Sequence, residues 1–200
     1  MKTITSILGA LLLATTLSAQ TQLVRGDIDS IQNTNRWRLD CTNIELVSQT
    51  VNLQALHDAS RQQDIEYELQ VRDVSTSTQT ILNVISATTI PELFDMGNIR
   101  LGRSDRWHVM GPVGHAAAVY LTGNASNTAY LPLGAMGTWL LTNFNLLTVG
   151  QISALGRYEF NLTPPNNSSL VGLVFTGQAI TVGAGAISIT NAQCKEVRSN

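Results

Sequence analysis

The residues of this chain best suited to metal chemistry are two histidines and one aspartate in its second half. His108 and His115 flank the segment VMGPVG, whose glycines and proline favour a tight turn that would bring the two imidazoles together. Asp105 is the nearest acid, and two histidines with one carboxylate form a known ligand set for metal ions. Because the spacing matches no metal-site signature, we keep these residues only as weak candidate ligands, and the sequence otherwise predicts no cofactor.

Other catalytic patterns do not occur in the sequence. A nucleophilic serine on a strained turn would need the pattern G-x-S-x-G, which is missing. A glycosidase needs two positioned carboxylates, and the second half offers only Asp105 and Glu159 before Glu196 near the end of the chain. The sequence therefore favours a protein without enzymatic activity.

Two cysteines, Cys41 and Cys194, lie far apart in the sequence. An oxidising compartment would permit a disulfide between them, and the sequence alone leaves the bridged and the unbridged state open. The segment RWRLDC alternates like a strand, with Trp37, Leu39 and Cys41 on its inward face. Because an inward-facing Cys41 would have to leave its core to reach Cys194, the pattern slightly favours the unbridged state.

Four aromatic residues of the second half could offer a surface to a sugar ring. They are Trp107, Trp139, Tyr120 and Tyr130. Their neighbours suggest alternation into a core, so core packing is the leading interpretation of all four. An exposed ring among them would instead support carbohydrate binding.

The first twenty residues have the features of a secretory signal peptide. Lys2 gives a short positive region, an uncharged stretch follows, and Ser18 and Ala19 are small residues suited to cleavage. We expect residues 1–20 to be removed and the protein to be secreted, periplasmic or displayed on the cell surface. The uncharged stretch is too short to span a bilayer, and the sequence predicts no membrane span after cleavage.

Charge divides the chain into two halves. Charged residues make up only 13% of the chain, and the net charge of −2 gives no reason to expect nucleic acid as a partner. Residues 21–95 hold five arginines and eleven acidic residues, a net charge of −6, whereas residues 96–200 carry +3. The change falls near the segment TTIPELFDMGN, where a proline and a glycine predict a domain boundary.

The acidic half is predicted to be a small barrel of strands with one short helix. In the segment IEYELQVRD the residues from Ile65 to Val71 alternate, so that Tyr67 and Leu69 face inward while Glu66 and Glu68 face outward. The segment NLQALHDASRQQ has its apolar residues at helical spacing. Four or five strands with one helix are typical of an OB-fold, so we expect residues 21–93 to form an OB-like barrel.

The second half is predicted to be a β-sandwich over residues 97–197. Short strands alternate with glycine, proline and asparagine turn signals about every 8–14 residues. Between Arg106 and Lys195 the only charged residues are Arg157 and Glu159. The expected fold class is therefore all-β, with a small OB-like barrel and one short helix followed by a β-sandwich.

A pattern of turn and packing residues runs through the C-terminal segment. It consists of Gly156, Pro165-Asn166, Leu170-Val171-Gly172, Phe175, Gln178-Ala179 and Thr190-Asn191. This pattern resembles that of uncharacterised secreted β-rich proteins of planctomycetes and related bacteria, and the resemblance covers about residues 97–194. It implies a secreted β module and carries over no catalytic residue.

Three functions remain open on the sequence. The leading hypothesis is a secreted, non-enzymatic structural or interaction module that associates with itself, because a nearly uncharged β surface offers little like-charge repulsion. The alternative is a carbohydrate-binding module whose partner would be a surface polysaccharide. A metal-dependent hydrolase using His108 and His115 is the third.

Overall fold

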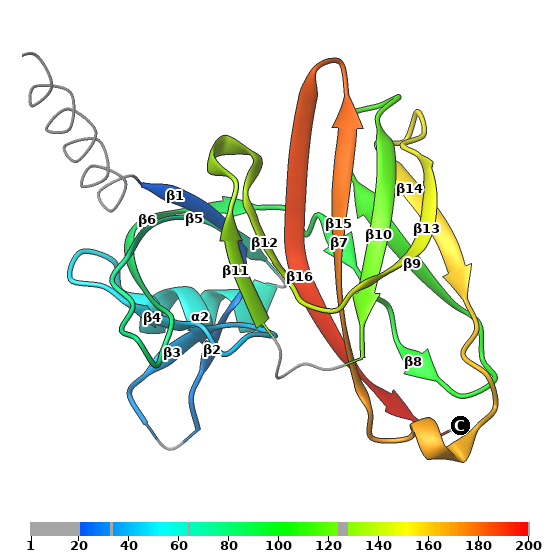
Figure 1. Ribbon diagram of the computed structural model, residues 1–200, viewed down its shortest axis with the longest axis horizontal. Coiled ribbons are helices and arrows are strands. Elements are labelled where there is room, and N and C mark those ends of the chain that lie inside the picture. Colours follow the sequence, from blue (N-terminus) through cyan, green and yellow to red (C-terminus); the bar gives the residue numbers. More distant parts are fainter. Residues whose placement is uncertain (1–20, 33, 64, 124–127, 200) are drawn as a thin grey trace, which may run out of the picture.

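The computed structural model describes residues 21–32, 34–63, 65–123 and 128–199 and shows an all-β fold (Figure 1). The expected fold class is confirmed: one curled sheet comes first, and a sandwich of two sheets follows. The expected signal peptide, residues 1–20, lies outside the described residues. In the part of the chain that is described, no helix is long and apolar enough to cross a membrane.

The first half consists of six strands and one helix in the described residues. They are β1 (Gln22–Gly26), β2 (Ile28–Ser30), β3 (Trp37–Leu39), β4 (Glu45–Val47), α2 (Leu53–Gln63), β5 (Glu66–Asp73) and β6 (Ile81–Ile90). The strands form one sheet in the order β1-β5-β6-β4-β3-β2, with β4 and β6 parallel.

This sheet closes on itself because its two edge strands follow each other in the chain. Only Asp27 separates the end of β1 from the start of β2. Gly26 permits the sharp bend with a φ of +156°, and a Cβ there would lie 3.0 Å from Leu39 Cδ1. If β1 and β2 are counted as one bent strand, the result is a five-stranded, partly open barrel with a helix between its third and fourth strands, as in an OB-fold.

Helix α2 closes one end of this barrel. Asn52 caps its N-terminus, since its Oδ1 accepts a hydrogen bond from the Ala55 amide at 3.1 Å. The buried His57 places Nδ1 2.7 Å from the carbonyl oxygen of Ile28 on β2, and the Tyr67 hydroxyl donates to the Leu56 carbonyl at 3.0 Å. These bonds tie the helix to the edge strand β2 and to β5, the neighbour of the other edge strand.

The second half contains the remaining strands. They are β7 (Phe94–Asp95), β8 (Ile99–Arg100), β9 (Asp105–Met110), β10 (Ala116–Thr122), β11 (Thr128–Pro132), β12 (Thr138–Leu141), β13 (Asn145–Gln151), β14 (Arg157–Leu162), β15 (Val174–Gly183) and β16 (Ala186–Arg198). Two short 3-10 helices, Gly134–Met136 and Ser168–Leu170, lie in the connections.

Two sheets of this half pack face to face as a β-sandwich. One has the order β13-β10-β15-β16-β8 and the other the order β14-β9-β7. Alternate residues point into the core between them, including the fully buried Phe94, Trp107, Val109 and Val119. A Cβ on Gly150 would lie 2.0 Å from the ring of Tyr158, so the two sheets approach closely at this end.

The hairpin of β11 and β12 joins the sandwich to the barrel (Figure 1). Leu140 of β12 belongs to the barrel core, whereas its neighbours Trp139 and Leu141 pack on Ile189, on the outer face of the five-stranded sheet. Because side chains alternate along a strand, one side of β12 packs on the barrel core and the other side packs on the sandwich.

The two cysteines form a disulfide between the halves, with their Cα atoms 5.4 Å apart. The expectation of an inward-facing Cys41 was wrong: β3 ends at Leu39, and Cys41 lies in the following turn with a left-handed φ of 61°. Its side chain is only partly buried and can reach Cys194 on β16 without leaving a core. The preference for the unbridged state is corrected for this reason.

Replacing Cys41 and Cys194 together by serine should lower the free energy of unfolding by about 2–5 kcal/mol, because the bridge closes a long loop in the unfolded chain. Denaturation in guanidinium, with and without a reducing agent, measures the loss. The reducing agent should destabilise the wild-type protein and leave the double variant unchanged. Two alkylated thiols in unreduced protein made in an oxidising compartment would contradict the bridge.

Candidate functional site

The candidate metal ligands of the second half are not gathered into one site. His108 lies on β9 with Nδ1 3.6 Å from Asp95 Oδ2, and Asp105 accepts hydrogen bonds from the amides of Asn98 and Arg106. His115 lies in the turn before β10, against the backbone of β15. Among the described residues, these side chains do not form a group of three ligand atoms within 4.8 Å of one another.

The four candidate sugar-stacking residues are largely occupied by protein contacts. Trp107 is fully buried between the two sheets, and Trp139 is 7% exposed on the side of the hairpin that faces the five-stranded sheet. Tyr120 meets Trp139 edge to face with ring centroids 5.3 Å apart, and the Tyr130 hydroxyl donates to the side-chain carbonyl of Gln22. These four rings therefore pack within the structure and form no flat aromatic platform.

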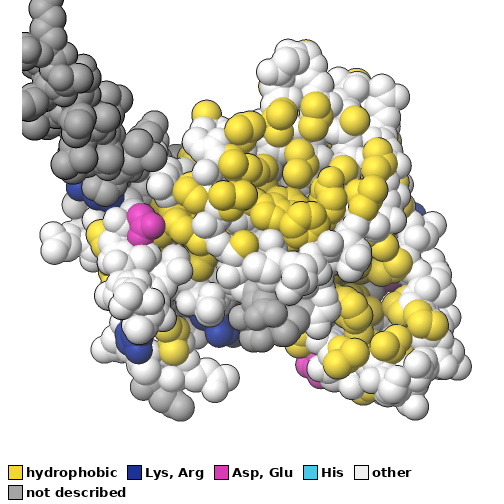
Figure 2. Space-filling model, in the orientation of Figure 1, with side chains coloured by type: hydrophobic (Ala, Val, Ile, Leu, Met, Phe, Trp, Pro, Cys, Tyr) yellow, Lys and Arg dark blue, Asp and Glu magenta, His cyan; other side chains and the backbone are white. Residues whose placement is uncertain are grey.

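The most prominent surface feature is an apolar patch on the outer face of the five-stranded sheet. It consists of Ala116, Ala118 and Tyr120 on β10, Leu146 and Val149 on β13, Ile180 and Val182 on β15, and Ile187 on β16. We call this surface the apolar face. Figure 2 shows hydrophobic side chains spread over these strands with no charged side chain among them.

The strand register makes the apolar face continuous. Ala118 pairs with Val149 on one side and with Ile180 on the other, and Val182 pairs with Ile187. Leu146, Val149, Val182 and Ile187 are each 46–58% exposed. Contiguous exposed apolar surface of this kind marks interaction sites in soluble proteins. Sequence alternation indicated core packing for Tyr120 but could not show that its side of β10 is left uncovered.

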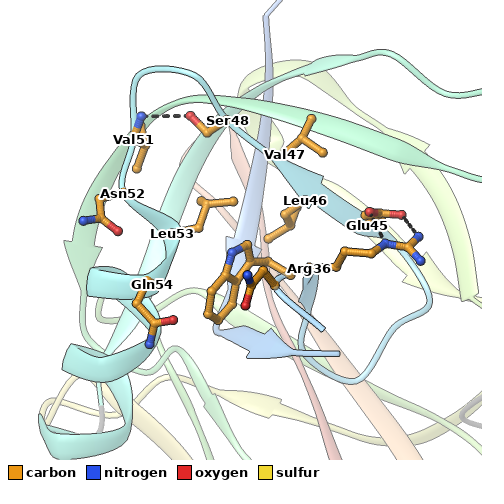
Figure 3. A pocket seen from close by; sticks show the side chains of 11 residues that line it. Arg36, Glu45, Leu46, Val47, Ser48, Val51, Asn52, Leu53 and Gln54 are labelled. Atoms are coloured by element: carbon orange, nitrogen blue, oxygen red, sulfur yellow. Dashed lines mark hydrogen bonds and ion pairs between the residues drawn. The ribbon is translucent and has the colours of Figure 1, made fainter. Parts of the chain in front are cut away.

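A second candidate is a pocket of about 350 Å³ on the barrel, between the β3–β4 hairpin and the start of α2 (Figure 3). The second and third strands of OB-folds commonly bind ligands on this side. The Arg36 Nε donates to Glu45 Oε1 at 2.7 Å, and Gln79 Nε2 donates to Glu45 Oε2 at 2.6 Å. The Arg36 hydrogen bond lowers the pKa of the Glu45 carboxyl. The arginine of this pocket is thus already paired, which gives a phosphate little to bind.

A third candidate is a polar cavity of about 190 Å³ at the junction of the two halves. Four carboxylates line it, those of Asp27, Asp40, Glu66 and Glu92. Glu66 is only 6% exposed, and burial, followed by repulsion from the other three, raises its pKa to about 8. Glu66 was expected to face solvent. That expectation was wrong because the second half covers this end of the outer face of β5.

Amide side chains of β16 hold Glu66 in this cavity. Asn191 Nδ2 and Gln193 Nε2 both donate to Glu66 Oε1, at 3.2 and 3.3 Å. Asn191 also accepts hydrogen bonds from the amides of Leu93 and Phe94. The buried carboxylate therefore lies where the connector, the barrel and the sandwich meet.

Comparisons with protein-family models, curated proteins and solved structures gave no match to this chain. The functional assignment therefore rests on the geometry of these three places.

The raised pKa of Glu66 predicts that the protein loses stability as the pH rises. The unfolded carboxyl releases its proton near its ordinary pKa of 4.5, whereas the folded one holds it to about 8. The free energy of unfolding should therefore fall by a few kcal/mol across this interval. In buffers with a chelator, the Glu66→Gln variant should melt at a higher temperature than wild type at pH 8 and show a flatter pH profile.

The matched control for this prediction is Glu159→Gln, which removes a partly exposed carboxylate on β14. It should keep the wild-type slope of melting temperature against pH between 4.5 and 8. If the melting temperature depends on pH in the same way in the wild type and in the Glu66→Gln variant, ionisation of Glu66 costs the folded protein no stability and the prediction is contradicted.

Proposed function

We propose that this protein is a secreted, non-enzymatic interaction module that associates with a second copy of itself through the apolar face. The observation that carries the proposal is the apolar face itself: β13, β15 and β16 present large apolar side chains to solvent there, β10 adds two alanines and part of Tyr120, and the face contains no charged residue. Exposing such a surface costs free energy in water, and covering it recovers about 25 cal/mol for each Å² buried.

A second copy suits this surface better than an unlike partner of charged character. A two-fold contact places the same patch against itself, so a charged patch would repel its copy, whereas an uncharged apolar sheet is self-complementary. The chain already uses the neighbouring surface in this way, because Trp139 of the β11–β12 hairpin packs on Ile189 of the same sheet face. The apolar face continues this internal contact outward.

The contact geometry resembles the packing of two sheets in a sandwich. Side chains of β10 and β15 would interleave with those of the partner across a layer about 10 Å thick. Strand β13 forms the edge of the five-stranded sheet, so the contact could extend to its unpaired side. The proposed role is structural, with the sandwich supplying the association surface and the barrel held rigidly beside it.

Placing lysine at Val149 and at Val182 together should abolish self-association, because the contact would then bury unpaired charges. Sedimentation equilibrium of the wild-type protein should show a dimer whose dissociation constant rises at least about tenfold in the double variant. Both sites are near half exposed in one copy, so the variant should retain its fold and its circular dichroism spectrum.

The control is Val113→Lys, at a 62% exposed position in the loop before β10 and outside the residues of the apolar face. This variant should associate like the wild type. A wild-type protein that stays monomeric at the highest soluble concentration would contradict the proposed self-association, as would an equal loss of association in the control.

A further inference from the structure

One tryptophan of the barrel is only partly covered, and it lines the pocket between the β3–β4 hairpin and the start of α2. Trp37 is the first residue of β3 and is half-buried, although alternation placed it on the inward face of its strand. The other two tryptophans of the chain are covered, since Trp107 is fully buried and Trp139 is 7% exposed. Trp37 is therefore the one indole that a ligand in solution can reach.

The ring of Trp37 is held in a fixed place by its neighbours. In the sheet, Trp37 pairs with Ser30 of β2 on one side and with Leu46 of β4 on the other. The imidazole of His57 lies beside the indole, with ring centroids 5.3 Å apart, and His57 is itself fixed by its contact with the Ile28 carbonyl. Because the ring is already ordered, a ligand that covers it causes little loss of side-chain entropy.

Polar side chains form the rim of this pocket. Figure 3 shows Asn52 and Gln54 on the side of α2, and Arg36 and Glu45 on the opposite side. Asn52 uses its amide oxygen to cap α2, and Gln54 uses its amide nitrogen on the carboxylate of Asp58, at 2.8 and 2.9 Å. The amide nitrogen of Asn52 and the amide oxygen of Gln54 remain for a ligand. The rim therefore offers both a donor and an acceptor.

The charge of the pocket favours a neutral ligand. Arg36 is the cation of the lining, and its Nε already donates to Glu45 Oε1 at 2.7 Å. The surrounding half of the chain carries a net charge of −6, so the phosphates of a nucleic acid would meet repulsion. A proline-rich peptide docks in a groove lined by several aromatic rings, whereas Trp37 is the single aromatic residue in this lining.

We propose that this pocket binds one ring of a neutral saccharide, with Trp37 as the stacking surface and the amides of Asn52 and Gln54 as partners of the hydroxyl groups. A pyranose ring has an apolar face of C–H bonds that packs on an indole, and a rim of hydroxyls that donate and accept hydrogen bonds.

The size of the pocket limits its occupant. Its volume of about 350 Å³ lies at the lower end of the ~300–1,000 Å³ that small-ligand sites span, which suits a single ring of a longer glycan. The site lies on the barrel, apart from the apolar face of the sandwich, and does not depend on self-association.

Tryptophan fluorescence of the whole protein tests the proposal, because ligand binding changes the surroundings of Trp37 and leaves the two buried indoles covered. The probes are cellohexaose, xylohexaose, mannohexaose, maltohexaose and chitohexaose at millimolar concentration, with hexathymidylate as the nucleic-acid probe. At least one of the glycans should shift the emission to shorter wavelength and reduce its quenching by acrylamide. The dissociation constant should be on the order of 1 mM or below, as expected for a contact of one sugar ring.

Isothermal titration calorimetry with the glycan that binds then locates the site. Trp37→Ala should weaken binding at least about tenfold, because it removes the stacking surface. Gln54→Ala, at an exposed position, should weaken it about three- to tenfold through the loss of a hydrogen bond. The matched control is Gln62→Ala, which removes an exposed glutamine of the same helix outside the pocket and should bind like the wild type.

The Trp37→Ala protein must melt cooperatively for its result to count, and Gln54→Ala tests the site independently if it does not. A wild-type protein that responds to none of the five glycans overturns the proposal, and so does a response to hexathymidylate alone. Unchanged binding in Gln54→Ala and in a folded Trp37→Ala protein places the sugar elsewhere and also overturns it.

Discussion

Two buried amide side chains on the β15–β16 hairpin hold the parts of this protein together. Gln178 donates to the Thr138 and Thr190 carbonyls and accepts from the Leu140 amide, each at 2.9 Å. These bonds fix the β11–β12 hairpin on the five-stranded sheet. Because both of its amide hydrogens and its oxygen are satisfied in a dry environment, the contact is specific as well as strong.

Asn191 does the same for the other junction. Its oxygen accepts from the backbone at Leu93 and Phe94, and its nitrogen donates to the Phe94 carbonyl and to Glu66. One side chain thereby sets the path of the connector and the position of the buried carboxylate. Because Asn191 holds both the connector and Glu66, the acidic end of the barrel lies against the sandwich, and the polar junction cavity forms there.

The same construction explains why one sheet face stays open. The three-stranded sheet covers the inner face of the five-stranded sheet, and the hairpin covers the part of the outer face around Ile189, Ile180 and Tyr120. Among the described residues, none covers the rest of the outer face, and β10, β13 and β15 contribute no charged residue there. A surface of this composition is well suited to association, and self-association is the proposal that fits its lack of charge.

Local patterns in the sequence predicted where the strands lie better than they predicted which other parts of the chain cover those strands. Alternation at Tyr67 and Leu69 identified β5 and its inward face, and the change of charge near residue 95 fell close to the point where the curled sheet ends. Glu66 was misjudged because alternation reports two faces of a strand and cannot show that another part of the chain covers the outer one. Cys41 was misjudged because the alternating pattern continued two residues beyond the end of β3.

The pattern of turn and packing residues in the C-terminal segment includes Gln178 and Asn191, the two amides that organise the fold. A pattern made of such residues predicts packing and says little about a ligand. For the same reason, the apolar face and the junction cavity could not be found from local sequence: each is assembled from strands or loops that meet only through long-range pairing.

Hydroxyl-radical footprinting at increasing protein concentration tests the proposed association through the apolar face most directly. The account predicts that oxidation of Leu146, Val149 and Ile187 falls as concentration rises, while the exposed Val113 and Leu155 remain equally reactive. Reactivity of the apolar face that does not change with concentration, or protection spread evenly over all five residues, would contradict the account.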